Sequence, residues 1–191
     1  MRQEFPEALR TLFAGAIYPE EGSLLYQIVM NYLPDIILET GTGYSTLFLA
    51  QATQDAQYGQ VFSVDSDGSR GTRLASLLVN YGLTCHLIQG TIPDVINTVQ
   101  LPIVDNFLAV VDSDHATEHV LLELEAIEQK ATGNLIILGH DAYHDTRAGD
   151  AYKQFALARG LPVAFIPTKR TPLVRHAFGF AIIVKQIYGV W

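Results

Sequence analysis

The sequence predicts an α/β fold: a doubly wound, mostly parallel sheet of seven strands with an antiparallel last strand and helices on both faces. Short apolar runs rich in β-branched residues alternate with segments of helical spacing, a pattern typical of parallel sheets. The last two strand-like runs are joined without room for a helix, and they must therefore pair as antiparallel neighbours. The 191 residues contain no repeat or linker, so we expect a single domain over residues 1–191.

The predicted elements follow a helical lead-in over residues 1–33, whose helix begins near Pro19. Five strand-like runs come next: DIILE (35–39), QVFSVD (60–65), LTCHLI (83–88), FLAVVDS (107–113) and NLIILGH (134–140). Because each can present an apolar stripe, the intervening segments predict helices at 44–54, 68–82, 91–100 and 116–130. A helix at 149–160 and two strands, at 161–168 and 177–187, come last.

The apolar stripe is clearest in the predicted helix 116–130. Its buried face is expected to consist of Val120, Leu121, Leu124 and Ile127. The acidic residues of the same helix are expected to face solvent: Glu123, Glu125 and Glu128.

Composition narrows the classes of partner. Twenty acidic against twelve basic residues give a formal charge of −8, which disfavours nucleic-acid binding and favours a small-molecule substrate.

The single cysteine, Cys85, allows no intramolecular disulfide, and its apolar surroundings predict a buried thiol. No segment approaches the roughly 20 apolar residues that span a bilayer, so we expect a cytoplasmic protein without a membrane partner. A homodimer is compatible with the sequence.

The segment ILETGTGYSTLFLA (36–49) is the strongest motif. Gly41 and Gly43 follow a buried strand and precede a helix, and we call residues 40–44 the glycine turn. Small residues there let the backbone approach a ligand, and the helix N-terminus offers free N–H groups. An ordinary strand-to-helix turn, capped by Thr42 or Ser45, would use the same glycines.

Two carboxylates favour a ligand other than a dinucleotide. Thr46 stands where a nicotinamide-binding motif would have its third glycine, and Glu39 would repel a pyrophosphate lying over the turn. A cationic or hydroxyl-rich ligand is favoured instead. The next strand ends in Asp65, where a carboxylate can accept both hydroxyls of a ribose, although a lone Asp there is often a helix cap.

With PEEGSLLYQIV before LETGTGYST, the sequence resembles the class I S-adenosylmethionine-dependent methyltransferases, especially the small and catechol-type O-methyltransferases. The resemblance runs from about Pro19 to Val184 and implies a Rossmann-like fold. It also implies that residues 39–45 hold the amino-acid end of the cofactor and Asp65 its ribose. In place of the family's acid near the adenine, this chain has IQGTIPD, which leaves Gln89 or Gly90. The cofactor-binding residues so predicted are Glu39, Gly41, Gly43, Ser45, Asp65, Gln89 and Asp112.

Acidic and histidine residues follow the fourth and fifth predicted strands, in VVDSDHATEH and LGHDAYHD. Because strand ends of an open α/β sheet meet at one edge, we expect these residues to gather there. This Asp–His rim comprises Asp112, Asp114, His115, His140, Asp141 and His144. Taken singly, Asp114 can cap the following helix, Asp112 can bond nearby backbone, and the histidines can be polar loop residues. Together they predict a divalent-metal or acid/base site.

The resemblance assigns roles to the rim. Its metal-binding positions fall on Asp112, His140 and Asp141, and its general base falls on His115, with His144 in reserve. A histidine ligand weakens the case for magnesium, which prefers oxygen, and admits manganese, zinc or iron, or no metal. Histidine titrates near neutrality and can take a proton from an attacking hydroxyl.

The predicted function is S-adenosylmethionine-dependent methyl transfer to a hydroxyl of a small molecule. The histidine content of the rim leaves open a metal-dependent oxygenase or hydrolase on the same fold. A protein that binds the nucleoside without turnover is a third alternative.

Overall fold

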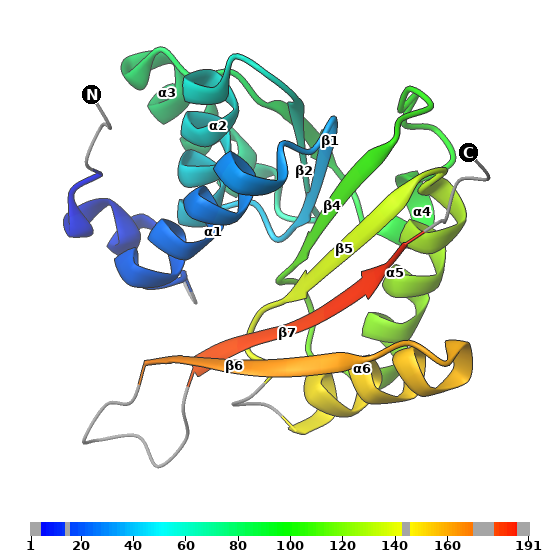
Figure 1. Ribbon diagram of the computed structural model, residues 1–191. Coiled ribbons are helices and arrows are strands. Elements are labelled where there is room, and N and C mark those ends of the chain that lie inside the picture. The colour runs from blue at the N-terminus through cyan, green and yellow to red at the C-terminus, as the bar shows by residue number, and fades with distance from the viewer. Residues whose placement is uncertain (1–4, 14–15, 143–145, 170–177, 187–191) are drawn as a thin grey trace. The chain divides into compact units, whose positions relative to one another are not determined.

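The computed structural model describes residues 5–13, 16–142, 146–169 and 178–186 (Figure 1). They form two compact units, Met1–Thr91 and Ile92–Trp191. Among the described residues, no helix is both long and apolar enough to cross a bilayer.

In the first unit, helices alternate with three parallel strands in the order β3-β2-β1. Its elements are η1 (Glu7–Leu12), α1 (Pro19–Tyr32), β1 (Ile36–Thr40), α2 (Tyr44–Ala56), β2 (Gln60–Asp65), α3 (Gly68–Tyr81) and β3 (His86–Gln89). The register pairs Thr40 with Val64 and Asp65 with Gln89. The carboxyl ends of the three strands therefore meet at one edge, which carries the glycine turn and Asp65.

Helix α1 is fixed at both ends and packs closely on α2. Its first residue is Pro19, and a proline fits there because the first N–H groups of a helix have no partner within the helix. The Glu21 carboxylate accepts the N–H of Tyr18 at 2.9 Å. The helix ends where Leu33 adopts a left-handed conformation. A side chain at Gly22 would lie 2.4 Å from the Phe48 ring, so glycine is required for this close approach of the two helices.

The second unit carries the antiparallel end of the fold, with strand order β4-β5-β7-β6. Its elements are α4 (Ile92–Val95), β4 (Asn106–Val111), α5 (Thr117–Lys130), β5 (Asn134–Gly139), α6 (Thr146–Arg159), β6 (Val163–Lys169) and β7 (Phe178–Lys185). Strands β4 and β5 are parallel, whereas β7 pairs antiparallel with both β5 and β6. The predicted α/β class, with seven strands and an antiparallel last strand, is confirmed.

Two predicted elements differ from the observed ones. Strand β3 begins at His86 rather than at residue 83, because the Leu83 N–H bonds the Leu78 carbonyl and closes the end of α3. The helix predicted at 91–100 is only the four residues of α4, followed by turns. There the Thr98 hydroxyl bonds the Val95 carbonyl at 2.7 Å, a side-chain bond of the kind that competes with helix continuation.

Helix α5 buries most of its predicted apolar stripe, although Leu121 is only half-buried, and Glu128, which the pattern places in solvent, is half-buried as well. Val120, Leu124 and Ile127 are buried, and Glu125 is exposed as expected. Glu123, however, was predicted to face solvent and is only 1% exposed. Its carboxylate meets hydrogen-bonding partners inside the unit, so burial does not leave it isolated.

Candidate active site

A cage of hydroxyl groups surrounds the carboxylate of Glu39, the last acidic residue before the glycine turn. Glu39 is 0% exposed. It accepts hydrogen bonds from Ser45 at 2.5 Å, from Thr46 at 2.5 Å and from Ser63 at 2.6 Å. The Ser63 hydroxyl is also 2.8 Å from that of Thr42. The carboxylate thus links strand β1, the turn, the first turn of α2 and strand β2.

This enclosure defines what Glu39 can do for a ligand. A carboxylate without exposed surface shapes the turn and leaves a negative charge beneath it. Together with burial, which is the larger cause, that charge raises the pKa of the Cys85 thiol, which is half-buried rather than buried as its apolar surroundings predict. A cation above the turn is favoured by the same field, whereas a phosphate is not.

The two glycines of the turn are there for different reasons. Gly41 has φ 87°, a left-handed conformation that side chains rarely adopt. Gly43 has an extended backbone at φ −176°, and a Cβ there would come no closer than 3.8 Å to any other atom, on the Phe13 ring. Neither the backbone conformation nor a close contact requires glycine at position 43, and the residue itself is buried.

The cap of α2 differs from the ordinary turn considered above. The N–H of Gly43 donates to the Thr46 hydroxyl at 3.0 Å, while Ser45 and Thr42 bond to Glu39 and Ser63 instead. Thr46, at the position of the absent third glycine, therefore closes the turn and tethers the acid.

Asp65 lies beside a small pocket of about 110 Å³ at the carboxyl edge of the first unit. Thr42, Gly68 and Gln89 are among the residues that line it. One oxygen of Asp65 accepts the Asp67 N–H at 2.7 Å, and the other is 3.6 Å from the Arg70 guanidinium. Asp65 thus serves the local turn and also borders the pocket.

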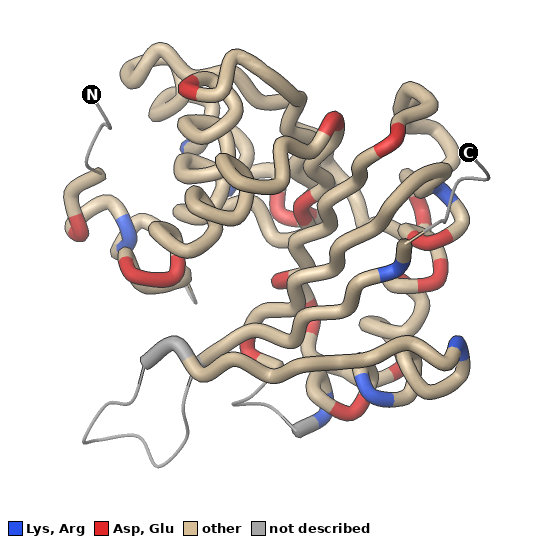
Figure 2. Tube along the Cα trace, in the orientation of Figure 1, with Lys and Arg blue, Asp and Glu red and all other residues tan. Residues whose placement is uncertain are grey.

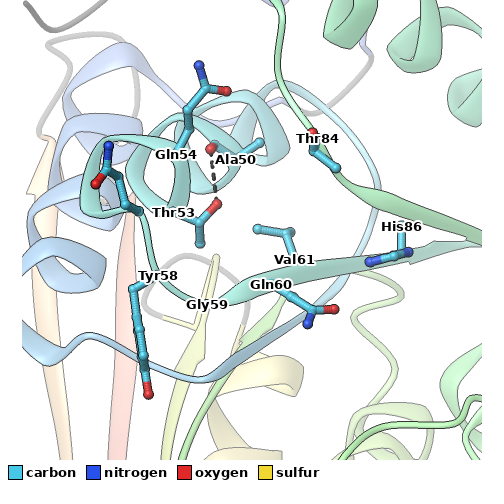
Figure 3. A pocket seen from close by; sticks show the side chains of 10 residues that line it. Ala50, Thr53, Gln54, Tyr58, Gly59, Gln60, Val61, Thr84 and His86 are labelled. Atoms are coloured by element: carbon cyan, nitrogen blue, oxygen red, sulfur yellow. Dashed lines mark hydrogen bonds between the residues drawn. The ribbon is translucent and has the colours of Figure 1, made fainter.

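A larger pocket of about 390 Å³ lies at the opposite, amino end of strand β2 (Figure 3). Its lining is neutral and includes Thr53, Gln54, Gln60, Thr84 and His86. No residue of the glycine turn lines this pocket, so the larger pocket is not the candidate cofactor site.

An N-terminal segment that sequence reasoning had not singled out packs over the glycine turn. Phe13 is buried and its ring lies over Gly43, while the Tyr44 hydroxyl donates to the Phe5 carbonyl at 3.0 Å. The Phe5 ring also meets those of Phe48 and Tyr81 edge-on, at centroid distances of 5.1 and 5.2 Å. The spacing of Phe5, Phe13 and Ile17 was a signal for this burial.

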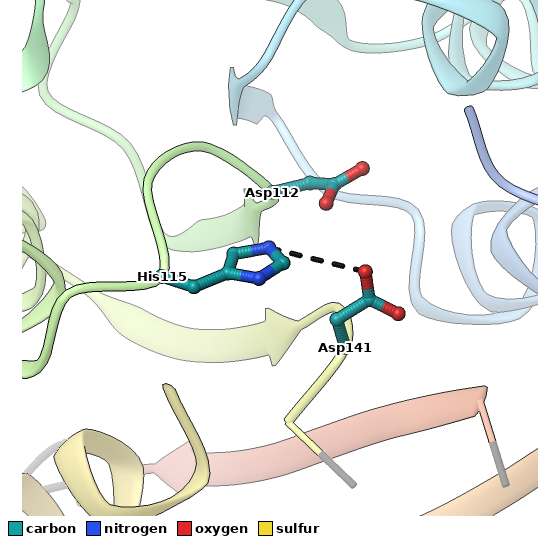
Figure 4. Close-up of side chains that lie close together, drawn as sticks. All are labelled: Asp112, His115 and Asp141. Carbon is teal, nitrogen blue, oxygen red and sulfur yellow. Dashed lines mark ion pairs between the residues drawn. The ribbon is translucent and has the colours of Figure 1, made fainter. Parts of the chain in front are cut away.

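In the second unit, three side chains of the Asp–His rim converge (Figure 4). Asp112 follows β4, His115 precedes α5, and Asp141 follows β5. One possible ligand atom from each lies within 4.8 Å of the others, and His115 Nε2 is 3.9 Å from Asp141 Oδ2. Two carboxylates and an imidazole at these distances can bind a divalent ion or exchange a proton.

His140 lies beneath this group and is 3% exposed. Its Nδ1 is 3.0 Å from Asp112 Oδ1 and 3.6 Å from Asp141 Oδ1, and its ring meets Phe180 edge-on. This arrangement suits a residue that orients the two carboxylates. Asp114 accepts the Ala116 N–H at 2.8 Å and so closes a turn, but the N-cap of α5 is Ala116, so Asp114 does not cap the helix. His144 lies outside the described residues.

The sequence pattern did not predict a buried polar layer behind the rim, which contains Glu123 and Tyr152. Glu123 accepts a hydrogen bond from Ser113, next to Asp112, at 2.6 Å. The Tyr152 ring is buried against Gly139, where a Cβ would lie 2.0 Å from the ring. Burial raises the pKa of Tyr152, and the charges of Glu123, Asp112 and Asp141 raise it further.

The fold and the acid-then-glycine turn define the class, a Rossmann-like methyltransferase fold. The chain belongs to the methyltransferase domain family, whose model matches residues 38–142. This match includes the glycine turn and the rim residues from Asp112 to Asp141, whereas His144 lies beyond it. No curated protein matches the sequence.

Solved structures show the same fold at low identity. The O-methyltransferase TomG from Streptomyces achromogenes, solved with S-adenosylmethionine, is 17% identical, and the match covers 90% of this chain and 82% of TomG with a TM-score of 0.73. An O-methyltransferase from Bacillus cereus, solved with S-adenosylhomocysteine, is 18% identical over 94% and 86%, with a TM-score of 0.72. An rRNA methylase from Streptococcus thermophilus is 17% identical over 86% and 95%, with a TM-score of 0.59.

Proposed function

We propose that this methyltransferase transfers the methyl group of S-adenosylmethionine to a hydroxyl of a small molecule. The observation that carries the cofactor assignment is the glycine turn: a buried carboxylate lies beneath it, and the left-handed backbone of Gly41 turns the chain sharply from β1 into α2. The bound cofactors of TomG and of the Bacillus cereus enzyme support the assignment.

The cofactor contacts we propose follow the chemistry of its parts. Gly41, Gly43 and Ser45 would hold the amino-acid end, with Glu39 acting through the turn rather than by direct contact. Asp65 would accept the ribose hydroxyls. The remaining proposed contacts are Gln89 toward the adenine and Asp112.

At the rim, Asp112 and Asp141 would hold a divalent ion, with His140 as an accessory ligand or orienting group. The donor set fits manganese, zinc or iron better than magnesium, because an imidazole is available beside the carboxylates. When bound, such an ion would make the acceptor hydroxyl more acidic.

His115 is the proposed general base, and His144 remains the alternative. His115 would accept the proton of the acceptor hydroxyl while a lone pair of the hydroxyl oxygen forms the new bond to the methyl carbon. The carbon–sulfur bond breaks with its electron pair staying on sulfur, so the products are a methyl ether and S-adenosylhomocysteine. Most of the rate would come from alignment of the oxygen with that bond.

An acceptor of small size is supported by the net charge of −8, since acidic residues outnumber basic ones along the chain (Figure 2). A single cysteine, which allows no intramolecular disulfide, suits a reducing, cytoplasmic setting, and a homodimer remains a proposal. Family membership disfavours the oxygenase and hydrolase alternatives.

Calorimetric titration with S-adenosylmethionine and with NAD tests the cofactor assignment, and we expect heat only with the former. A screen of hydroxylated acceptors, with and without EDTA, then tests transfer. If methyl transfer is unchanged by EDTA, the proposed metal ion is wrong, but the methyltransferase assignment stands. Binding without transfer to any acceptor would favour a non-catalytic nucleoside-binding protein.

A further inference from the structure

The buried carboxylate of Glu123 is in an unfavourable place for a residue that serves packing alone. It lies on α5 between residues of the apolar stripe and is 1% exposed. Burial is the largest cause acting on its pKa and raises it, which reflects the free-energy cost of a desolvated charge. An apolar side chain of similar volume would fill this position at lower cost.

The partners of Glu123 point to the neighbouring loop. One oxygen accepts the Ser113 hydroxyl at 2.6 Å, and the other is 3.4 Å from His119 Nε2, one turn earlier on α5. Ser113 directly follows Asp112, and the loop continues to His115 before α5 begins. The hydrogen bond therefore ties the loop that carries two rim residues to a rigid helix.

The same loop is held at its other contacts. The Asp112 carboxylate is 3.0 Å from the buried His140, and Asp114 bonds the backbone at Ala116. The bond to Glu123 fixes the segment between these two points. Reacting groups need such support, because a shift of about 1 Å can lower a rate roughly 100-fold.

We propose that Glu123 is a positioning residue, which through Ser113 sets where Asp112 and His115 lie. The link to catalysis rests on the proposed methyl transfer, whereas the link to the positions of the side chains does not.

Three variants of neighbouring α5 residues separate positioning from stability. Glu123→Leu removes the acceptor, Glu123→Gln keeps one acceptor oxygen for Ser113, and Leu124→Ala weakens the adjacent buried packing but keeps the carboxylate that bonds Ser113. Imidazole ¹⁵N signals of His115 and His140, assigned with His115→Gln and His140→Gln, report the rim directly. The kcat and the KM for S-adenosylmethionine are measured alongside.

We expect Glu123→Leu to shift both imidazole signals and to lower kcat by about 10–100-fold with KM little changed. Glu123→Gln should restore both signals and most of the rate. Leu124→Ala should lower the unfolding temperature but leave the signals in place. Should Glu123→Leu not fold, Ser113→Ala removes the same hydrogen bond from the loop side and is expected to shift the same signals.

The proposal is overturned if Glu123→Leu folds and its imidazole signals match those of the wild type. If Glu123→Leu does not fold, wild-type signals in Ser113→Ala overturn it. It is also overturned if Leu124→Ala shifts them equally, or if Glu123→Gln is as impaired as Glu123→Leu. An inactive wild type would refute methyl transfer, yet the imidazole signals would still decide the positioning role.

Discussion

Two carboxylates are enclosed by hydrogen-bonding side chains, and each adjoins a candidate site. Glu39 lies under the glycine turn in the first unit, and Glu123 lies behind the rim in the second. In both cases hydroxyl groups satisfy the buried acceptor: those of α2 and β2 for Glu39, and that of Ser113 in the loop before α5 for Glu123. Such buried polar groups hold loops in one arrangement only if every partner remains in place.

Glu39→Gln tests the cage under the turn. Glutamine offers one acceptor oxygen where three hydroxyls donate to a carboxylate, so at least one buried donor loses its acceptor. We expect the free energy of unfolding in urea to fall by about 1–3 kcal/mol. The exposed Glu125→Gln serves as control and should change it by no more than about 0.5 kcal/mol. Equal stability of the two variants would show that the cage does not stabilise the turn.

Asp65→Ala tests the ribose contact. Loss of a charged acceptor should weaken the binding of S-adenosylhomocysteine by about 1–3 kcal/mol in calorimetry. Asp65 also bonds the Asp67 N–H, so Asp65→Asn, which can keep that bond, separates the turn from the ligand. We expect the asparagine variant to bind with intermediate affinity. Unchanged affinity in Asp65→Ala would place the ribose elsewhere.

At the rim, two variants distinguish the proposed general base from the proposed metal ligand: His115→Gln removes the base, and Asp112→Ala removes the ligand. His115→Gln should spare cofactor binding and lower the rate by about 10²–10⁴-fold, the usual share of a general base. If a metal is bound, Asp112→Ala should abolish both metal content, measured by elemental analysis, and turnover. Full activity of His115→Gln across neutral pH would make the base assignment wrong.

At the scale of elements, Glu128 ties three of them together in the second unit. This residue of α5 bonds Arg159 of α6 at 2.5 Å and Lys185 of β7 at 2.9 Å. Burial raises its pKa, but these two cations outweigh burial and leave the pKa lowered. The two pairs therefore link the helices to the antiparallel strand in a pH-dependent way.

Glu128→Gln should reveal that dependence. A carboxyl whose pKa is lower in the folded state adds stability above its ordinary pKa of 4.5, and this stability is lost as pH falls through the lowered value. We expect the variant to be less stable by about 0.5–1 kcal/mol near neutral pH, since the pairs are partly exposed. Urea denaturation at acidic pH should show the difference shrinking. A difference that persists at the lowest pH would exclude the ion pairs as its source.

The elements themselves could largely be predicted from local pattern. Strands β1, β2, β4 and β5 are apolar runs buried along most of their length, which is the strongest signal a sequence gives for a parallel sheet. The burial of Glu123 could not be predicted, because its compensating hydroxyl, Ser113, comes from a loop ten residues away. The packing of Phe13 over Gly43 depends likewise on tertiary contact between distant segments.

At the scale of the whole molecule, each unit places its polar residues just after the carboxyl ends of parallel strands. The glycine turn follows β1, Asp65 ends β2, and Asp112 and Asp141 follow β4 and β5. Open α/β sheets bind their ligands at this edge, so the location of both candidate sites follows from topology. The acceptor does not follow from topology, because the same fold is shared with an rRNA methylase.

Net charge is the basis for our expectation of a small-molecule acceptor rather than RNA. With a formal charge of −8, the chain lacks the cationic excess through which proteins displace counterions from phosphates. We expect no change in fluorescence anisotropy of a labelled RNA hairpin at physiological salt, and no transfer of radiolabelled methyl groups to total RNA. Hydroxylated small molecules should accept the label under the same conditions, and binding of S-adenosylhomocysteine confirms that the protein sample is folded. Label in RNA that declines steeply with added salt would contradict the small-molecule assignment, since such a decline marks contacts to phosphates.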